Sequence, residues 1–321
     1  MSKGVSMENY HNKIDLVYLW VDGNDPAWQT KRNAFIGRTE ENSSINCKGR
    51  YANNDELKYS LRSIEMYAPW IRNIFIVTDN QVPEWLDLSN PKIKVVDHTE
   101  ILPSESLPCF NSSLIEHFIC KISGLSEYFL FANDDMFINK PVYPHTFFAE
   151  DGLPIIRLTN SLLRDWFLSF KEKFLGIPFK NYVQIIRNSA KLVEHKFGVY
   201  YRVKPHHNID AYLKSDCERV EKMFHFEISR TLSNHIRNAN DLQRSLYTFV
   251  ALAENRCHPL HVTQKISFRF HIQKIKHYDK LKKYDPVFFC MNDSEYANDS
   301  DRERVKDFLS KRFPKKSSFE K

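Results

Sequence analysis

Two adjacent carboxylates, Asp134 and Asp135, follow an apolar run at 128–132 and a single amide, Asn133. A run of aromatic and aliphatic residues like this one is typical of a strand buried on both faces of an α/β sheet. In open α/β sheets, ligands bind beyond the carboxyl ends of the strands. Carboxylates at that edge can hold a divalent cation, which can in turn bind phosphate oxygens. The alternative is that both residues only cap a turn, because Asn and Asp favour turns.

A second group of reactive side chains lies in the later half of the chain. His206 and His207 stand side by side after Pro205, where an imidazole could act as a general base. An ordinary surface turn is the competing interpretation of the two histidines. The apolar run at 287–291 ends in another Asn–Asp pair, which makes Asp293 a further acidic candidate.

Strand and helix patterns alternate along the segments that position these groups. We predict strands at 14–21, 74–79, 93–98, 128–138 and 287–293. Helix 55–67 lies between the first two and places Leu57, Leu61 and Ile64 on one face. This alternation predicts an α/β fold with a doubly wound, mostly parallel, Rossmann-like sheet.

The alternation of strand and helix patterns stops at 147–202, where long helical stretches rich in aromatic and basic residues replace the short strands. We therefore predict an inserted, mostly helical subdomain at 147–202. The α/β core then comprises 1–146 and 203–300, and 301–321 forms a C-terminal helix with a basic tail.

The first predicted strand runs into a dense turn at 22–26, which is where many nucleotide-binding α/β folds begin. Arg62 could direct a guanidinium toward phosphate, although a solvated helix arginine is commoner. Asn111 and Ser112 cap a short helix that carries Glu116 toward the 133–135 segment. With only 8 glycines and no G-x-G-x-x-G or Walker-type pattern, any phosphate must be held by metal, Arg or Lys, and helix N-termini.

The composition narrows the class of protein. The 321 residues are 42% hydrophobic and carry a net charge of +6, so a disordered chain is excluded. Six scattered cysteines form no C-x-x-C pair, which argues against zinc-ribbon and thioredoxin sites. A polar N-terminus and the lack of a 20-residue apolar run predict a cytoplasmic protein. The basic segment 272–283 could be a solvated face, or could contact an anionic polymer or lipid headgroups, and no RNA-recognition motif accompanies it, so we expect no nucleic acid partner.

The chain resembles the Stealth family of sugar-phosphate transferases. The resemblance is carried in order by 14–26, by 50–86 with Asn133-Asp134-Asp135, by 207–238, and by 289–293 with 314–320. It is especially close at 55–64, and it leaves 147–200 uncovered. The family includes bacterial capsular polysaccharide phosphotransferases and the catalytic subunit of the lysosomal-enzyme N-acetylglucosamine phosphotransferase. The short bacterial members are the most similar in form.

The resemblance implies transfer of a hexose or N-acetylhexosamine 1-phosphate from a UDP-sugar to a sugar hydroxyl of a growing capsular or cell-surface polysaccharide, with release of UMP. It implies that Asp134, Asp135 and Asp293 hold Mg²⁺ or Mn²⁺. His207 would act as base and Arg237 would neutralise phosphate charge, with Glu116 and Asp135 as further catalytic residues. Because His206 directly precedes His207 in the sequence, either of the two histidines could be the base. We expect the nucleotide sugar to contact the following residues: Trp20, Asp22, Asp25, Arg62, Asn111 and Ser112.

Three other functions remain to be distinguished. A metal-dependent glycosyltransferase would use the same donor and metal but would release UDP. A metal-dependent phosphodiesterase would consume polymer without any nucleotide sugar, and a non-enzymatic scaffold would use the acidic pairs only as turn caps. The phosphotransferase would bind a UDP-sugar and a phosphodiester-containing oligo- or polysaccharide acceptor. We also expect contact with the inner face of the membrane or with capsule-assembly proteins.

Overall fold

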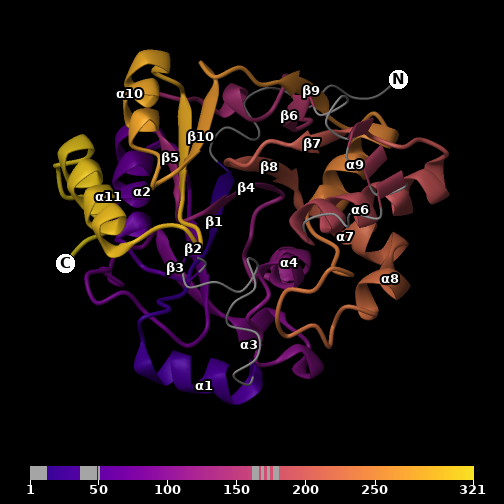
Figure 1. The fold of residues 1–321 in the computed structure, drawn as a ribbon, viewed down its shortest axis with the longest axis horizontal. Helices are drawn as coiled ribbons and strands as arrows, with labels where there is room; N and C mark the ends of the chain where they lie inside the picture. Colours follow the sequence, from indigo (N-terminus) through magenta and orange to yellow (C-terminus); the bar gives the residue numbers. More distant parts are fainter. Residues whose placement is uncertain are drawn as a thin grey trace.

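A five-stranded sheet in the order β3-β2-β1-β4-β8 forms the centre of the computed structural model (Figure 1). The structure describes residues 13–36, 49, 51–160, 166–167, 170–171, 174–175 and 181–321. The strands are β1 (Ile14–Leu19), β2 (Ile74–Thr78), β3 (Ile93–Asp97), β4 (Tyr128–Asn133) and β8 (Asp210–Leu213). The first four pair in parallel, and β8 runs antiparallel beside β4. The predicted α/β fold with a mostly parallel sheet is confirmed.

Both faces of this sheet are covered, which explains why its strands are apolar throughout. Along β4, Phe129 and Phe131 point into one core, whereas Leu130 and Ala132 point into the other. The first core contains side chains of α4 (Ser112–Ile115), η4 (Glu116–Lys121), α6 (Asn181–Phe197), α7 (Lys214–Met223) and α9 (Ser245–Ala253). The second contains side chains of α2 (Glu56–Tyr67).

A second sheet has the strand order β10-β11-β5, and its strand β5 packs against α2. It consists of β10 (Ser267–His271), β11 (Phe288–Asn292) and β5 (Met136–Ile138). Only two residues, 134 and 135, lie between the end of β4 and the start of β5, and they form the turn that joins the two sheets. Helices α10 (Ile275–Tyr284) and α11 (Asp299–Arg312) cover the outer side of the second sheet. The acidic pair therefore lies where the two sheets meet.

The stretch 147–202 contributes both a strand and a helix. Strand β6 (Ile155–Asn160) pairs with β7 (Val203–Pro205) and β9 (His258–His261), and α6 packs against α9. The sequence Ile155-Ile156-Arg157-Leu158-Thr159 favours a strand because β-branched residues pack well in a sheet. The proposed division into domains stays a prediction.

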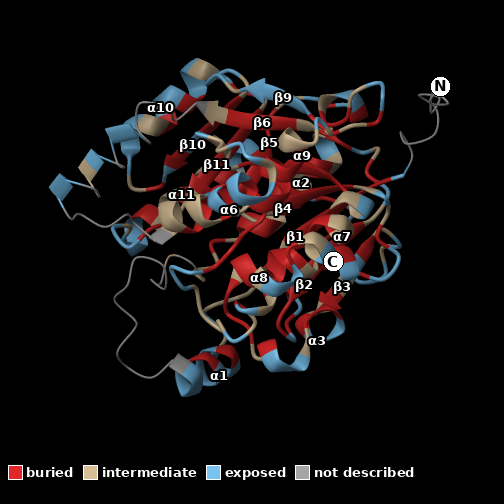
Figure 2. Ribbon diagram, turned by 90° about the vertical axis from the view of Figure 1, so that its right-hand side faces the viewer, coloured by how far each residue is buried: buried red, intermediate tan, exposed pale blue. Residues whose placement is uncertain are grey.

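The remaining helices are short or lie near the surface. They are α1 (Pro26–Ile36), α3 (His98–Ile101), η3 (Ser104–Ser106), η5 (Pro144–Thr146) and α8 (His225–Ser229). The strands of the central sheet are mostly buried, whereas β9 is exposed and α1 and α10 each present an exposed face (Figure 2). No helix in the described ranges is both long and apolar enough to cross a bilayer.

Candidate active site

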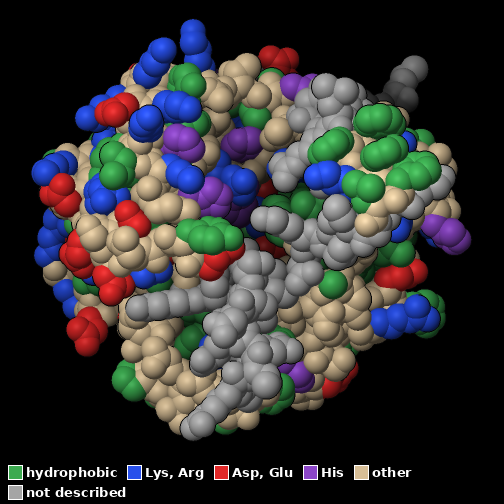
Figure 3. All heavy atoms as spheres, viewed as in Figure 1, with side chains coloured by type: hydrophobic (Ala, Val, Ile, Leu, Met, Phe, Trp, Pro, Cys, Tyr) green, Lys and Arg blue, Asp and Glu red, His purple; other side chains and the backbone are tan. Residues whose placement is uncertain are grey.

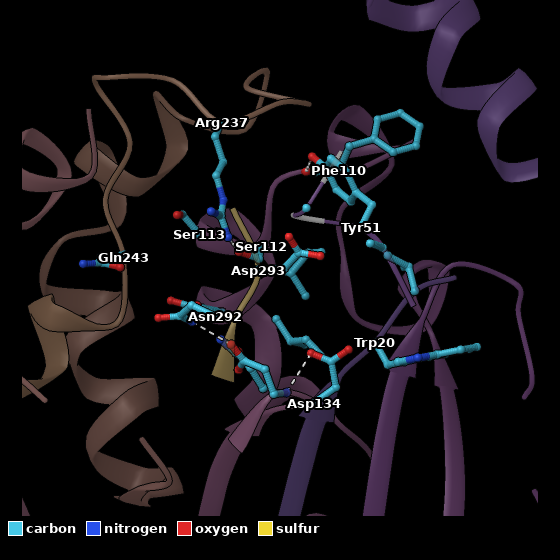
Figure 4. A pocket seen from close by; sticks show the side chains of 18 of the residues that line it. Trp20, Tyr51, Phe110, Ser112, Ser113, Asp134, Arg237, Gln243, Asn292 and Asp293 are labelled. Carbon is cyan, nitrogen blue, oxygen red and sulfur yellow. Dashed lines mark hydrogen bonds between the residues drawn. The ribbon is translucent and has the colours of Figure 1, made fainter. Parts of the chain in front are cut away.

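A pocket opens at the carboxyl ends of β1 and β4 (Figure 4). Trp20 follows β1, and Asp134 and Asp135 follow β4. Loops from the rest of the chain close the other sides: Ser112 begins α4, and Arg237 lies before α9. The topology thus brings together residues from widely separated parts of the sequence, as expected for the edge of a parallel sheet.

Asp134 lies in a crowded group of carboxylates. Burial, together with the neighbouring charges of Glu56 and Asp135, raises the pKa of Asp134 well above its usual value. Neither Asp134 nor Glu56 forms an ion pair within the described part of the chain. Like charges held this close favour a cation or a proton between them. The pocket therefore offers oxygen donors of the kind that Mg²⁺ and Mn²⁺ bind.

Glu56 is an acidic pocket residue that the sequence analysis did not single out. Its side chain is 4% exposed and lines the pocket at the start of α2. Asn54 donates to both of its carboxylate oxygens, from the backbone N–H at 2.6 Å and from Nδ2 at 2.7 Å. Between them, Asp55 has a φ of 63°, a left-handed conformation that is uncommon outside glycine. Burial raises the pKa of Glu56 to about 7.

Asp135 lies beside His207. One ligand atom each of Asp135, His207 and Cys290 lie within 4.8 Å of one another. Burial and the Asp135 carboxylate keep the pKa of Cys290 well above its usual value, so Cys290 remains a thiol that donates to Asp135 Oδ2 at 3.3 Å. Asn292 Nδ2 donates to the same oxygen at 2.7 Å. Cys290 and Asn292 therefore orient the carboxylate next to the imidazole.

The two adjacent histidines occupy different environments. His207 lines the pocket, whereas His206 does not. Burial and the charges of Arg269, Lys204 and Arg157 lower the pKa of His206 to about 4. The backbone N–H of His206 donates to Arg157 O, whereas the imidazole Nδ1 of His206 is buried without a hydrogen-bond partner. The structure thus favours His207 as the histidine that can meet a substrate.

Arg237 reaches into the pocket from its loop toward the start of α4 (Figure 4). Its guanidinium donates to Ser112 Oγ. Asn111 lies just behind, fully buried, and its Nδ2 donates to Asp241 Oδ2 at 2.9 Å and to Asn234 O at 3.0 Å. Ser112 therefore lines the pocket. Asn111 does not: it holds the Arg237 loop in place.

Glu116 also lines the pocket, but it is held by Arg244. Arg244 Nη1 donates to Glu116 Oε1 at 3.0 Å, and its Nε donates to Asp210 Oδ2 at 3.2 Å. Burial works against the charge of Arg244, but the two carboxylates raise its pKa above the usual value. Burial also raises the pKa of Asp210 to about 6, an effect that Arg244 opposes. Glu116, Arg244 and Asp210 form a buried triad that joins η4, β8 and the start of α9.

Asp293 lies in the pocket wall with its carboxylate already engaged. Arg302 donates to its two oxygens at 2.8 and 3.2 Å, and the backbone N–H of Ser294 donates at 2.6 Å. A metal ion at Asp293 would have to share these oxygens with Arg302 and Ser294. Oxygens of Asp134 and Asp135 are the better candidates.

Besides Asn111, three residues predicted to contact the nucleotide sugar lie outside the pocket lining: Asp22, Asp25 and Arg62. Asp22 and Asp25 stabilise the turn after β1, where they accept from Asn53 Nδ2 and Gln81 Nε2 respectively. Arg62 is bound to the C-terminal segment instead of lining the pocket. Its guanidinium binds Glu320 through two hydrogen bonds of 2.8 and 2.7 Å, on the side of α2 that faces the C-terminal segment. No pattern within helix 55–67 could reveal a partner 258 residues away.

Comparison with known proteins identifies the family. The family models for Stealth protein CR1, conserved region 1, and CR2, conserved region 2, match residues 12–40 and 50–156. An exopolysaccharide phosphotransferase of Lactiplantibacillus plantarum is 30% identical over 96% of each chain. One from Streptomyces coelicolor is 35% identical over 98% of this chain, and a capsular polysaccharide phosphotransferase of Neisseria meningitidis serogroup A is 34% identical over 98%.

The present chain spans 53% and 58% of the Streptomyces and Neisseria proteins, but nearly the whole of the Lactiplantibacillus one. The two conserved-region matches contain Trp20, Glu56, Glu116 and Asp134–Asp135, and the full-length match extends the similarity across His207 and Arg237. The chain belongs to the Stealth family.

Proposed function

We propose that this chain transfers a hexose or N-acetylhexosamine 1-phosphate from a UDP-sugar to a hydroxyl of a growing capsular or cell-surface polysaccharide, releasing UMP. The observation that carries the proposal is one pocket lined by Asp134, Asp135, His207 and Arg237. Carboxylates suited to a metal, a base beside them and a cation opposite are the groups that phosphoryl transfer needs. The names of the relatives support the same class of reaction.

The proposed step is an in-line displacement at the β-phosphorus of the donor. The acceptor oxygen forms a bond to that phosphorus, and the bond from phosphorus to the bridging oxygen breaks. UMP leaves with the bridging oxygen, and the sugar 1-phosphate becomes a phosphodiester. His207 takes the proton of the acceptor hydroxyl, a contribution of about 10²–10⁴-fold to the rate. Arg237 balances negative charge on the phosphoryl oxygens.

Oxygens of Asp134 and Asp135 would hold Mg²⁺ or Mn²⁺. The raised pKa of Asp134 and the crowding by Glu56 are the features of this site that fit a divalent cation. Such an ion would neutralise charge on the diphosphate of the donor. Asn292 and Cys290 fix the orientation of the Asp135 carboxylate.

Identification of the released nucleotide tests the proposal directly. Purified protein would be incubated with a panel of UDP-sugars and short acceptor oligosaccharides, and the nucleotide would be separated by chromatography. Release of UMP together with a phosphodiester product is the expected result. Release of UDP would replace the proposal by glycosyl transfer, and loss of polymer without any nucleotide sugar would indicate a phosphodiesterase.

A further inference from the structure

Basic side chains form a strip that begins at the pocket and follows β10 and α10. We define the basic strip as Arg269, His271, Lys274, His277 and Lys280. The members lie close enough to affect one another's charge. Burial lowers the pKa of His271, and the charges of Arg269, His277 and Lys274 lower it further. Burial, and then Lys280 and Lys274, lower that of His277. Blue and purple side chains over β10 and α10 extend down to the central hollow (Figure 3).

Strand β10 connects the basic strip to the proposed base. Ser267, Arg269 and His271 alternate with the buried Phe268 and Phe270, so they share the other face of the strand. On that face, Asn208 Nδ2 donates to Ser267 Oγ at 2.6 Å. Asn208 directly follows His207, so this hydrogen bond places the face of β10 against the histidine turn.

The register of β10 brings the same face next to the carboxylate site. Arg269 pairs with Cys290, and His271 pairs with Asn292. Those partners are the two residues that hold Asp135. Neighbouring strands lie about 4.8 Å apart, so His271 lies one strand spacing from Asn292, which lines the pocket.

The charge of the basic strip is largely uncompensated. Arg269, Lys274 and Lys280 are exposed, and none of them forms an ion pair with the described residues. Glu295 lies near His271 and weakens the field there. The charge of Arg269 is still felt at His206 and at Cys290. An anion that leaves the pocket along β10 therefore meets consecutive cations.

We propose that the basic strip binds phosphodiester groups of the acceptor chain, so that the enzyme prefers acceptors that already carry phosphodiesters. This inference rests on the proposed function, because each transfer adds one negative charge to the polymer. The strip lies on the His207 side of the pocket, where the acceptor hydroxyl must arrive. Arg237 lines the same pocket from the loop before α9, where it would meet the donor diphosphate.

A glycan chain fits the basic strip better than a membrane does. His271 pairs with Asn292, which lines the pocket, and a single flexible chain can enter that pocket whereas a flat bilayer surface cannot. Phosphodiesters spaced along a chain can also meet Arg269, Lys274 and Lys280 in succession. Charge-assisted contacts to phosphate are strong and weaken with added salt.

The test compares Arg269→Gln/Lys274→Gln with a matched control, Lys94→Gln/Lys311→Gln. The control removes the same charge from β3 and α11, outside the pocket lining. Calorimetry would measure binding of a synthetic glycerol phosphate oligomer, which carries one charge per phosphodiester. Kinetics would compare the acceptor KM for a neutral oligosaccharide and for the same oligosaccharide extended by several phosphodiester-linked units.

We expect the strip variant to bind the glycerol phosphate oligomer about tenfold more weakly, which corresponds to the loss of about 1.4 kcal/mol. Its KM should rise about tenfold for the extended acceptor and less than twofold for the neutral one, with donor KM unchanged. The control should behave as the wild type does. Equal KM changes for both acceptors would overturn the inference, as would unchanged oligomer binding.

Two further outcomes separate this inference from the proposed function. If the wild type releases no UMP from any donor, the proposed function fails, and the oligomer-binding arm still reports on the basic strip. Sedimentation with anionic phospholipid vesicles forms a third arm. Vesicle binding that is lost in the strip variant, while oligomer binding persists, would assign the strip to lipid headgroups and overturn the glycan assignment.

Discussion

At the residue scale, the acidic turn after β4 provides the sharpest test of the metal proposal. Asp134→Asn or Asp135→Asn removes a charged ligand from a site already crowded with carboxylates. We expect transfer to fall by at least about 10²-fold while the unfolding transition stays cooperative, because the loss falls on charge stabilisation of the phosphoryl group. EDTA should abolish wild-type transfer, and Mg²⁺ or Mn²⁺ should restore it. Full transfer activity in EDTA would contradict the proposal that Asp134 and Asp135 hold a metal ion.

His207 and Arg237 should fail in different ways. His207→Ala removes the group that accepts the hydroxyl proton, so kcat should fall about 10²–10⁴-fold with nearly normal donor binding. Arg237→Ala should weaken donor binding as well as turnover, because its contact with phosphate exists in the ground state and in the transition state. Calorimetry would give donor affinity, and UMP release would give turnover.

His206→Ala is the matched control for His207→Ala. His206 lies outside the pocket lining, so its replacement should change kcat by less than a few-fold. An inactive His206→Ala with an active His207→Ala would move the base by one residue. If neither variant loses turnover, the proton must go to another group in the pocket, such as Glu56 or Glu116.

At the element scale, the triad of Glu116, Arg244 and Asp210 decides whether Glu116 is catalytic or holds the pocket together. Arg244→Met would leave two buried carboxylates facing each other, and we expect a loss of about 3–5 kcal/mol in the free energy of unfolding. Glu116→Gln keeps the shape and one hydrogen bond, so its loss should be smaller. Urea unfolding would measure both changes.

Transfer assays of the same variants separate the two roles of Glu116. If Glu116 acts by holding Arg244, the activity of Glu116→Gln should fall only moderately, and Asp210→Asn should fall to a similar extent. A Glu116→Gln variant with normal stability, normal donor affinity and a kcat reduced more than about 10³-fold would instead make Glu116 catalytic.

The elements differ in how well sequence reasoning could find them. Strands β1, β2 and β4 were predictable because both faces are buried and their sequences are therefore apolar throughout. The position of Asp134 and Asp135 after an apolar run was predictable for the same reason. The single strand predicted at 128–138 was wrong, because these two residues form a turn between β4 and β5, which belong to different sheets. Strand β6 was missed because it lies in a stretch dominated by helical and aromatic patterns.

Long-range pairing explains what the sequence could not reveal. Arg244 lies 128 residues from Glu116, and only the folded sheet brings them together. Glu56 resembled an ordinary residue of a first helical turn, where acidic side chains are common. Its approach to Asp134 depends on how α2 packs across the sheet, which no local spacing records.

At the scale of the whole molecule, buried histidines predict how stability depends on pH. His117 is 1% exposed, with its Nδ1 at 3.1 Å from Tyr247 Oη, and burial lowers its pKa to about 4. The unfolded chain takes up this proton near pH 6.5, whereas the folded chain does so only near pH 4. The contribution to stability is therefore complete above pH 6.5 and is lost as the pH falls toward 4.

The expected loss from His117 at pH 5 is about 2 kcal/mol. Urea unfolding at pH 7.5 and at pH 5 would be compared for the wild type and for His117→Gln. The variant should lose less stability than the wild type between the two pH values, whatever its stability at pH 7.5. Equal losses in both proteins would show that other groups govern the acid response.

The last prediction concerns the contact between α2 and the C-terminal segment, in which Arg62 takes part. The side chains of Arg62 and Glu320 are 11% and 3% exposed, and Arg62 Nη1 also donates to Phe313 O at 2.7 Å. Phe319, beside Glu320, packs into the core that contains Leu57 and Leu61. We expect Arg62→Met to cost about 2–3 kcal/mol of unfolding free energy, because charged hydrogen bonds are lost in a largely buried place.

A double-mutant cycle with Glu320→Gln isolates this contact. The double variant should lose less stability than the sum of the two single variants, because each single change already removes the pair. Donor affinity should stay within twofold of the wild type in all three variants, since Arg62 lies outside the pocket lining. Weaker donor binding in Arg62→Met at unchanged stability would contradict this assignment and would indicate that Arg62 contacts the phosphate of the donor. Additive losses would instead mean that the two side chains act independently, and that other contacts, such as those of Phe319 and Ser318, hold the C-terminal segment against α2.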